Sequence, residues 1–363
     1  MHGMQAHVEA VIEAFRRGEL VVVADDDDRE NEGDLFVAAS LCTPEKMAFI
    51  IRHTSGIVCA PLSVDEAKRL RLDPMVAVND APLGTAFTVS VDFRHGTTTG
   101  ISAEERTNTV RALANHNTGP ADFARPGHVF PLIAREGGVL MRSGHTEACI
   151  DLCRLAGLPA VGVLAELMND DGTVMRGGQV AAFAERHGLK RISIADLISH
   201  RQAREKLVER VAEFPVGSEI GPLTGYAYVT PFDKVHHMAF VHGRIGDGEN
   251  VLARLHRADV IGDVFGGAKA IHATLARFKA DGRGVLIYLR DGTAGVPVVA
   301  RPPDGESSSE AARSAQWREI GLGAQILRDL EISSIRLLSS RQWTYVGLAG
   351  FGIEIASTEA LEG

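Results

Sequence analysis

Cysteine is scarce in this chain of 363 residues, and every cysteine lies in its first half. The four positions are Cys42, Cys59, Cys149 and Cys153. They do not form the framework of a disulfide-rich secreted protein, so a reducing, cytoplasmic compartment is predicted. The chain also lacks an apolar run of about 18 residues, the length of a membrane span, and its N-terminus does not resemble a signal peptide. No membrane partner is therefore expected.

Positive charge is the second shortage. The formal net charge is -9, and no cluster of basic residues stands out, which argues against a nucleic-acid partner. Hydrophobic residues make up 45% of the chain, enough for two domains with sizeable cores.

Acidic residues, by contrast, gather in Asp25–Asp34, which holds seven carboxylates and one guanidinium in ten residues. This segment follows Leu20–Val23, an apolar run typical of a buried strand. Ligands of α/β folds usually lie at strand ends. Carboxylates about 5 Å apart repel by roughly 0.8 kcal/mol in water and about 3 kcal/mol at an effective dielectric constant of 20. The segment is therefore either a fully solvated turn or a cation site.

A second polar cluster, Arg142–Glu147, follows the strand-like Val139–Met141 and leads into a segment with helical periodicity, Ala148–Ala156. An arginine, a glycine and a threonine at a helix start suit an anion, because the backbone N–H groups and the helix dipole favour negative charge there. His145 is either a metal ligand or a hydrogen-bonded structural residue. A third segment, the proline-bounded turn Arg125–Pro131, is either part of a site or a rigid connector.

Longer motifs carry a family resemblance. In chain order they are DDDDRENEGD, RHTSGIVC, GTTTGISAEERTNTVRAL, RPGHVFPL, RSGHTEACIDL and GVLAELMNDDGTVMR. Residues 1–205 closely resemble 3,4-dihydroxy-2-butanone 4-phosphate synthase, an enzyme of riboflavin biosynthesis. The resemblance implies conversion of D-ribulose 5-phosphate into 3,4-dihydroxy-2-butanone 4-phosphate and formate with Mg²⁺ or Mn²⁺. It also implies a homodimer with the active site near the subunit interface.

The family's functional residues fall on positions that carry the same residue types here. Its metal ligands fall on Glu30 and His145, and its essential histidine falls on His128. Its substrate contacts fall on Arg29, Asp34, Arg142, Ser143, Gly144, His145, Thr146 and Glu166. Cys59 lies in a motif that resembles the family's active-site wall, so it is a candidate pocket residue whose oxidation would reduce activity.

The chemistry explains these residue types. Loss of a proton beside the sugar carbonyl forms an enediolate, which a divalent cation stabilises as a Lewis acid. Mg²⁺ keeps open positions for substrate oxygens, and an imidazole ligand suits Mn²⁺. Glu166, Asp34 and His128 are the candidate acid–base groups, and which of them takes the first proton stays open. Arg142 and Thr146 are the expected phosphate contacts.

Alternating helices and strands indicate an α/β fold, or a layered α+β fold, for the first domain. Periodicity and capping residues predict helices at Val8–Arg17, Thr43–His53, Val64–Leu72, Ala103–Ala114, Gln179–His187 and Ile194–Val211. A short strand is expected at Arg191–Ile194, and alternating strands and turns at Asn79–Thr99. Phe214–Gly217 marks the expected boundary, and the second domain spans residues 213–363.

In that second domain, three segments resemble GTP cyclohydrolase II of the same pathway: Val251–Asp263, Ala280–Arg290 and Gly321–Leu338. An α/β domain is again expected. The predicted elements are strands at His237–His242, Gly284–Leu289 and Ile335–Leu338, a helix at Ala312–Asp329 and a mobile loop at Arg301–Ser309.

The lack of cysteine after Cys153 separates this half from that family, whose catalytic zinc is held by three cysteine thiolates. Asp259 stands at the first ligand position, and the stretch of the other two is shortened to Gly266–Gly267. A zinc site needs about four ordered ligands, so the domain is expected to be degenerate and zinc-free. It is either a structural or interaction module, or a GTP hydrolase with an altered metal site. A ligand-binding, regulatory role for the whole chain is the remaining alternative.

Overall fold

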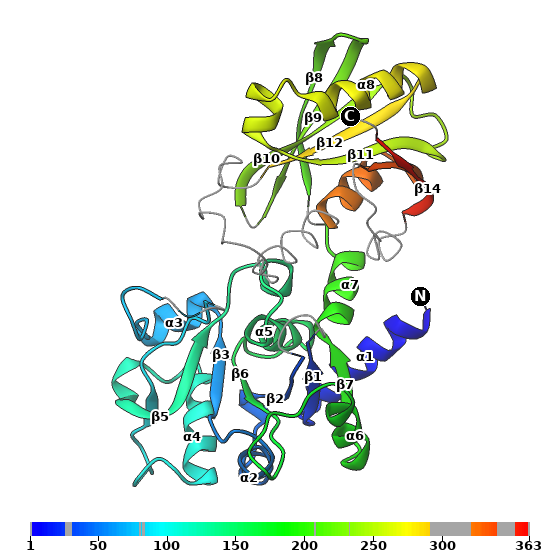
Figure 1. Cartoon of the computed structure of the whole chain (residues 1–363). Coiled ribbons are helices and arrows are strands. Elements are labelled where there is room, and N and C mark those ends of the chain that lie inside the picture. Colours follow the sequence, from blue (N-terminus) through cyan, green and yellow to red (C-terminus); the bar gives the residue numbers. More distant parts are fainter. Residues whose placement is uncertain are drawn as a thin grey trace. The chain divides into compact units, whose positions relative to one another are not determined.

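The computed structural model describes residues 2–25, 31–79, 81, 84–206, 208–231, 233–290, 321–339 and 353–361. The chain divides into two compact units, Met1–His200 and Arg201–Gly363, each of which contains its own sheet (Figure 1).

A mixed sheet of seven strands, in the order β4-β5-β3-β6-β2-β1-β7, is the centre of the first unit. Its strands are β1 (Val21–Ala24), β2 (Gly33–Ala38), β3 (Cys59–Leu62), β4 (Val91–Phe93), β5 (Phe123–Ile133), β6 (Gly162–Glu166) and β7 (Lys190–Ser193). Its helices are α1 (His2–Arg16), α2 (Pro44–His53), α3 (Val64–Leu70), α4 (Ala103–Leu113), α5 (His145–Leu155) and α6 (Gly178–Arg186), and α7 (Ile194–Arg204) follows β7. Three short 3-10 turns complete it: η1 (Ala39–Leu41), η2 (Pro120–Asp122) and η3 (Gly138–Leu140).

Helices cover both faces of this sheet, and the side-chain alternation of β2 shows which face is which. Leu35 and Val37 belong to the core formed with α2, α4 and α6, whereas Phe36 packs edge-on against His145 at the start of α5. Because side chains alternate along a strand, Asp34 faces α5 as Phe36 does. The α5 face of the sheet, here called the polar face, therefore carries Asp34 beside the apolar Phe36.

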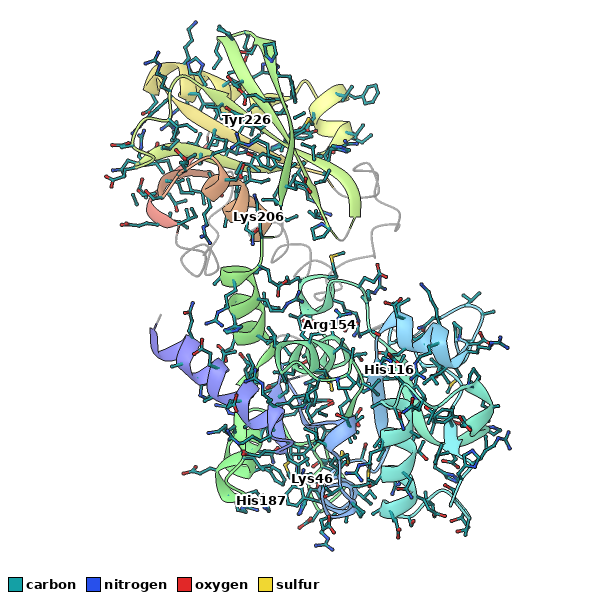
Figure 2. All side chains as sticks on the ribbon, turned by 180° about the vertical axis from the view of Figure 1, so that it is seen from behind. Lys46, His116, Arg154, His187, Lys206 and Tyr226 are labelled. Carbon is teal, nitrogen blue, oxygen red and sulfur yellow. The ribbon has the colours of Figure 1, made fainter. Side chains whose placement is uncertain are left out.

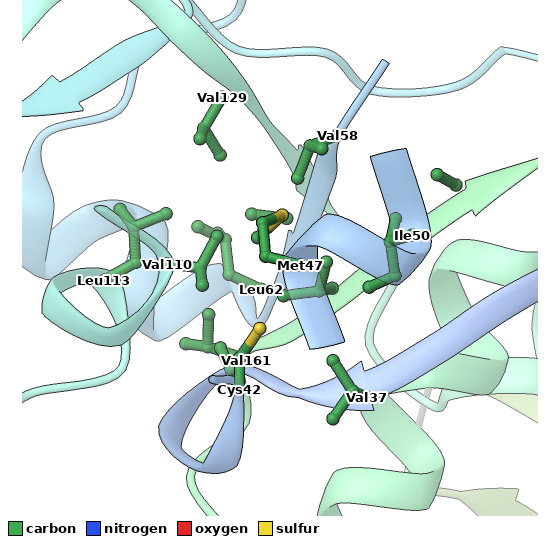
Figure 3. Close-up of a cluster of buried hydrophobic side chains, with 14 of the residues drawn as sticks. Val37, Cys42, Met47, Ile50, Val58, Leu62, Val110, Leu113, Val129 and Val161 are labelled. Carbon is green, nitrogen blue, oxygen red and sulfur yellow. The ribbon is translucent and has the colours of Figure 1, made fainter. Parts of the chain in front are cut away.

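The opposite face is apolar. Figure 3 shows its side chains converging between α2, α4 and the sheet, and the labelled members are Val37, Cys42, Met47, Ile50, Val58, Leu62, Val110, Leu113, Val129 and Val161. All of them are fully buried. Burying one such side chain contributes about 1.5–3 kcal/mol, so this layer supports the sheet from behind its polar face.

The helix starts follow from local sequence. The Thr43 side chain accepts the N–H of Lys46, and Pro44 is the first residue of α2. Ser102 and Glu105 form a reciprocal capping box at the start of α4. Such a cap contributes about 1 kcal/mol, and these two helices begin where the sequence predicted.

Several predicted elements were wrong. The final helix of the first half ends at Arg204 rather than Val211, because β8 (Glu209–Ser218) begins there and pairs with the next strand. Phe214–Gly217, predicted as a domain boundary, therefore lies inside a strand. The turn at Arg125–Pro131 is part of β5, where its apolar residues pair with β3, and the strand-like Val139–Met141 lies at the 3-10 turn η3.

The second unit contains a sheet in the order β14-β13-β11-β12-β10-β9-β8. Besides β8, its strands are β9 (Gly221–Thr230), β10 (Asp233–His242), β11 (Val251–Arg257), β12 (Gly284–Leu289), β13 (Ser334–Ser339) and β14 (Glu354–Ala360). Its helical elements are the π-helical turn η4 (Ile261–Phe265), α8 (Lys269–Asp281) and residues 321–329. Strands β8, β9 and β10 form an antiparallel meander, and β11 is parallel to β12 and β13.

Side-chain contacts connect β8, at one edge of this sheet, to the helix at residues 321–329. The Arg210 guanidinium lies 4.6 Å from the ring centre of Tyr226, labelled in Figure 2, and bonds to Asp329 at 2.8 Å. Leu252, Phe278 and Leu286 form the core between the sheet and α8. The predicted fold class, two α/β domains in sequence, is thus confirmed. The predicted loop Arg301–Ser309 and the first half of the predicted helix, residues 312–320, lie outside the described residues.

Candidate active site in the first unit

Two carboxylates lie side by side on the polar face of the first sheet. Asp34 of β2 and Glu166 of β6 are direct partners in the antiparallel register. The Ser55 hydroxyl donates to Glu166 Oε2 at 2.7 Å, and the Ser55 N–H donates to the Glu166 carbonyl at 2.8 Å. Asp34 is only 2% exposed. The sheet therefore holds two acids next to each other, one buried and one fixed by a serine.

An imidazole joins these carboxylates from the start of α5. His145 Nε2 lies 3.9 Å from Asp34 Oδ1, and the ring of His145 meets the ring of Phe36 at 75° with 6.1 Å between their centres. Both side chains are buried. A carboxylate–imidazole pair at this distance provides oxygen and nitrogen donors to a common position.

Cys59 lies on the same face of the sheet as Asp34 and Glu166. It pairs with Leu164 of β6, two residues before Glu166, so the two side chains lie on the same face of the sheet. Burial raises the pKa of the Cys59 thiol well above its usual range, and the nearby Glu166 and Asp34 carboxylates raise it further. The thiol is therefore neutral, and its place as a residue of the substrate pocket stays a prediction.

His128 lies further along the same edge. Phe130 of β5 pairs with Cys59, and His128 is two residues before Phe130. Because β3 is parallel to β5 and antiparallel to β6, His128 lies toward the same end of the sheet as Glu166, which is two residues after Leu164. Its Nδ1 atom is 2.7 Å from Asp92 Oδ2, and its N–H donates to Asp92 Oδ1 at 2.8 Å. The side chain is 44% exposed, against 11% for Asp92. A buried acid thus orients an accessible imidazole.

A glycine makes room for this pair. A Cβ atom on Gly100 would lie 2.1 Å from Asp92 Oδ2 and 2.8 Å from His128 Nδ1, and its φ is +84°. Only glycine adopts that backbone conformation easily. Any side chain at position 100 of the GTTTG motif would therefore clash with the His128–Asp92 pair.

The segment that the sequence predicts as an anion site lies at the N-terminus of α5. Gly144 is the N-cap, Ser143 lies half-buried directly before it, and His145 and Thr146 are buried in the first turn. Arg142 Nη1 donates to Glu147 Oε2 at 2.7 Å, so the guanidinium lies beside the helix start. Helix N-termini favour anions through their N–H groups and dipole. This corner adjoins the carboxylates through the contact between His145 and Asp34.

The acidic segment connects β1 to β2 as a hairpin, since Ala24 pairs with Gly33. Its ends are tied by the Asp25 N–H to the Glu32 carbonyl at 3.2 Å and by the Glu32 N–H to Asp25 Oδ1 at 3.0 Å. Glu32 also bonds to Arg176 at 3.0 Å. The predicted ligand Glu30 and the predicted substrate contact Arg29 lie outside the described residues.

Three residues of the site were not predicted: Ser55, Asp92 and Glu147. Ser55 and Glu147 stand inside motifs that carried the resemblance, RHTSGIVC and RSGHTEACIDL. Asp92 had no local signal, because only the pairing of β4 with β5 brings it to His128.

The donor set suits a hard divalent cation. Within the described ranges, no three histidine, cysteine or acidic side chains converge closely enough to hold a metal by themselves. The pair formed by His145 and Asp34 nevertheless offers one nitrogen and one oxygen ligand, which fits the partly open coordination of Mg²⁺ and Mn²⁺.

The second unit has a different polar cluster where the cyclohydrolase resemblance places a metal. His256 Nε2 lies 2.9 Å from Asp263 Oδ1, the Tyr288 hydroxyl donates to Asp263 Oδ2 at 2.7 Å, and the Asp259 N–H donates to the same oxygen at 3.0 Å. Burial opposes ionisation of Asp263, but these bonds outweigh it and lower its pKa. Asp259 itself accepts the N–H groups of Ile261 and Gly262 at 3.1 Å.

Both halves match known families. The sequence model of 3,4-dihydroxy-2-butanone 4-phosphate synthase matches residues 9–200, and that of GTP cyclohydrolase II matches residues 209–360. The chain belongs to the 3,4-dihydroxy-2-butanone 4-phosphate synthase family. The predictions of a lyase and of an enzyme of riboflavin biosynthesis are thereby confirmed.

Relatives extend over both units. The bifunctional riboflavin biosynthesis protein RIBA 1 of Arabidopsis thaliana is 46% identical over 96% of this chain and 67% of its own length. A crystal structure of RibBX, a two-domain 3,4-dihydroxy-2-butanone 4-phosphate synthase from A. baumannii, has a TM-score of 0.82, 37% identity and coverage of 98% and 99% of the two chains. A crystal structure of the synthase in complex with two magnesium ions has a TM-score of 0.54 and 48% identity, covering 54% of this chain and 97% of its own.

Among the helices that the structure describes, none has both the length and the hydrophobicity to cross a bilayer.

Proposed function

We propose that the chain converts D-ribulose 5-phosphate into 3,4-dihydroxy-2-butanone 4-phosphate and formate through the polar face of its first sheet. The observation that carries this proposal is the convergence of Asp34, Glu166 and His145 beside the N-terminus of α5. Acids and an imidazole that can move protons there adjoin a corner that can bind a phosphate. Membership of the synthase family supports the same reaction.

Glu166, Asp34 and His128 are the proposed acid–base groups. The Asp92 carboxylate accepts a hydrogen bond from Nδ1–H of His128, so in the neutral ring Nε2 carries the lone pair and can act as a base. Ser55 orients the Glu166 carboxylate by donating to Oε2. Asp34 and Glu166 are partners in the register, so both carboxylates face the same part of a bound sugar.

Arg142, Ser143, Gly144 and Thr146 are the proposed contacts for the phosphate end of the substrate, and Arg29 is a further proposed contact. Glu30 and His145 would hold the divalent cation. When bound, the cation supplies Lewis-acid stabilisation to the oxygens of the substrate. The chain's own groups then place the sugar phosphate and carry the protons. Both Mg²⁺ and Mn²⁺ are expected to support activity, since the latter accepts an imidazole more readily.

We also propose residues 1–205 as the synthase domain of a cytoplasmic homodimer. Residues 213–363 are proposed as a domain without zinc and without GTP cyclohydrolase II activity. The support is the set of hydrogen bonds around Asp263, whose carboxylate bonds to His256, to the Tyr288 hydroxyl and to the Asp259 N–H. The RibBX structure, named as a two-domain synthase, has the same extent as this chain.

The experiment is to supply purified full-length protein with D-ribulose 5-phosphate and to measure formate and the four-carbon phosphate. Turnover is expected with Mg²⁺ and with Mn²⁺ and should stop in EDTA. Folded protein that is inactive with both cations would overturn the proposal and favour a binding or regulatory protein. In parallel, stoichiometric zinc together with formate release from GTP would overturn the proposal for the second domain.

A further inference from the structure

Glu147 is a buried acid that the reaction as proposed does not use. It lies in the first turn of α5, and its side chain is 1% exposed. Oε1 accepts the N–H of Arg135 at 3.0 Å, and Oε2 accepts Nη1 of Arg142 at 2.7 Å. An ionised carboxylate is costly to bury unless it is paired and hydrogen-bonded. Both oxygens of Glu147 meet that condition through these two donors.

The Arg142 guanidinium is held on three sides. Besides Glu147, Nη2 donates to the Thr85 hydroxyl at 3.2 Å, and the side chain is 11% exposed. On the third side, a Cβ atom on Gly144 would lie 2.2 Å from Nη1 of Arg142 and 2.8 Å from Oε2 of Glu147. The glycine N-cap thus lets the ion pair lie directly on the helix start. Arginine recognises phosphate with a rigid fork, so its orientation matters as much as its charge.

We propose that Glu147 is a positioning residue that fixes the Arg142 guanidinium at the N-terminus of α5 for the phosphate of the substrate. The inference rests on the proposed function, in which Arg142 contacts that phosphate. The inference predicts the direction in which KM changes when Glu147 is replaced. A carboxylate repels a phosphate dianion, so if only its charge mattered, loss of Glu147 would lower KM. If it positions Arg142, its loss raises KM.

The test variant is Glu147→Gln in the full-length protein, assayed with D-ribulose 5-phosphate. A glutamine side chain has one acceptor oxygen and one NH₂ group, so it cannot accept from both Arg135 and Arg142. KM is expected to rise about tenfold, the effect of one charge-assisted hydrogen bond, with kcat changed much less. The inhibition constant of inorganic phosphate should rise in parallel.

Glu66→Gln is the matched control. Glu66 is also a buried acid in the first turn of a helix, α3, and it pairs with Arg69 at 2.6 Å. Its loss should lower thermal stability without changing KM. Thr85→Val removes a second contact of Arg142 from a less buried position, and it should raise KM by a smaller factor, about twofold to fivefold.

Unchanged or lowered KM in Glu147→Gln, with active wild-type protein, overturns the inference and leaves the proposed function intact. Should Glu147→Gln fail to fold, an unchanged KM and phosphate inhibition constant in Thr85→Val overturn it instead. Wild-type protein without turnover overturns the proposed function, and this inference with it.

Discussion

At the scale of single residues, the site depends on groups that the structure orients rather than on the reacting groups alone. Ser55, Asp92 and Glu147 each accept or donate a hydrogen bond that fixes a neighbour proposed to act on the substrate. Sequence patterns do not reveal such contacts. Two of them join elements far apart in the chain, and the third, between Glu147 and Arg142, depends on how the chain enters α5.

Asp92→Asn tests the orientation of His128. An asparagine presents either an amide NH₂ or a carbonyl to Nδ1, so the ring loses its fixed tautomer, and kcat should fall by about a hundredfold or more with little change in KM. Asp122→Asn is the control, because Asp122 makes a similar 2.8 Å pair with the exposed His95 outside the site. Equal rates for the two variants would exclude a role for the His128–Asp92 pair.

His145→Ala and Glu30→Gln test the proposed cation ligands. Each variant should lose turnover while keeping the wild-type circular dichroism spectrum and thermal midpoint within a few degrees, since ligand loss removes Lewis-acid stabilisation rather than packing alone. Binding of Mn²⁺, followed by electron paramagnetic resonance, should weaken in both. An active Glu30→Gln protein would contradict the metal assignment.

The thiols should resist modification in the native state. Burial raises the pKa of Cys42 to about 11 and that of Cys59 further, and all four cysteines are buried. Because the thiolate is the reactive form, iodoacetamide at pH 7.5 should label native protein at least about a hundredfold more slowly than protein in urea. The predicted sensitivity of Cys59 to oxidation therefore becomes a prediction of resistance, and rapid labelling of native Cys59 would refute it.

At the scale of elements, the start of α4 has an acid with unusually many donors. Glu105 accepts from the N–H and hydroxyl of Thr98, the N–H of Thr99, and the N–H and hydroxyl of Ser102. The side-chain bond from Thr98 is the largest of the effects that hold the pKa of Glu105 far below its usual range. These bonds order the GTTTG segment, whose Gly100 contacts His128 and Asp92.

Glu105→Gln should therefore destabilise the first unit in a pH-dependent way. A depressed folded-state pKa contributes stability that is fully present above the unfolded value, about 4.3, and is lost as pH falls through the folded value. The difference in thermal midpoint between wild type and variant should be largest near pH 7 and shrink below about pH 4. Glu104→Gln, at the exposed position before it, is the control, and a pH-independent difference for Glu105→Gln would contradict the argument.

The elements also show how far sequence reasoning reached. Capping residues such as Thr43 and Ser102 located helix starts, because their bonds are local. The second domain's β12 was predicted at its observed bounds, Gly284–Leu289, since an apolar run between glycine and charge is typical of a buried strand. The end of α7 was missed, since only pairing between β8 and β9 decides where the helix stops.

For the site, the structure brings Asp34, Glu166, Cys59 and His145 together at one end of the sheet, and the register explains why. Asp34 pairs with Glu166, and Cys59 pairs two residues away from it. No spacing in the sequence encodes that register, because β2, β3 and β6 are separated by whole helices. The roles of these residues stay predictions until the variants are assayed.

At the scale of the whole molecule, the two units should respond differently to metal removal. The second unit has a closed hydrogen-bonded cluster around Asp263, so its thermal midpoint in EDTA should match that in buffer, and purified protein should contain less than about 0.1 zinc per chain. Asp263→Asn should lower that midpoint, because His256, Tyr288 and Asp259 then lose a common acceptor. A midpoint that falls in EDTA and returns with added Zn²⁺ would contradict a zinc-free domain.

The hydrogen bonds around Asp259 and Asp263 also make it costly to introduce a thiol ligand at this position. Asp259→Cys would place a thiol where the resemblance expects the first zinc ligand, and it would remove the carboxylate that accepts the N–H groups of Ile261 and Gly262. That step costs about 1 kcal/mol, and by itself it supplies one of the roughly four ligands that a zinc site needs. A domain without zinc, as proposed, would therefore not gain that metal through this substitution alone, and its sequence would be free to diverge toward other uses.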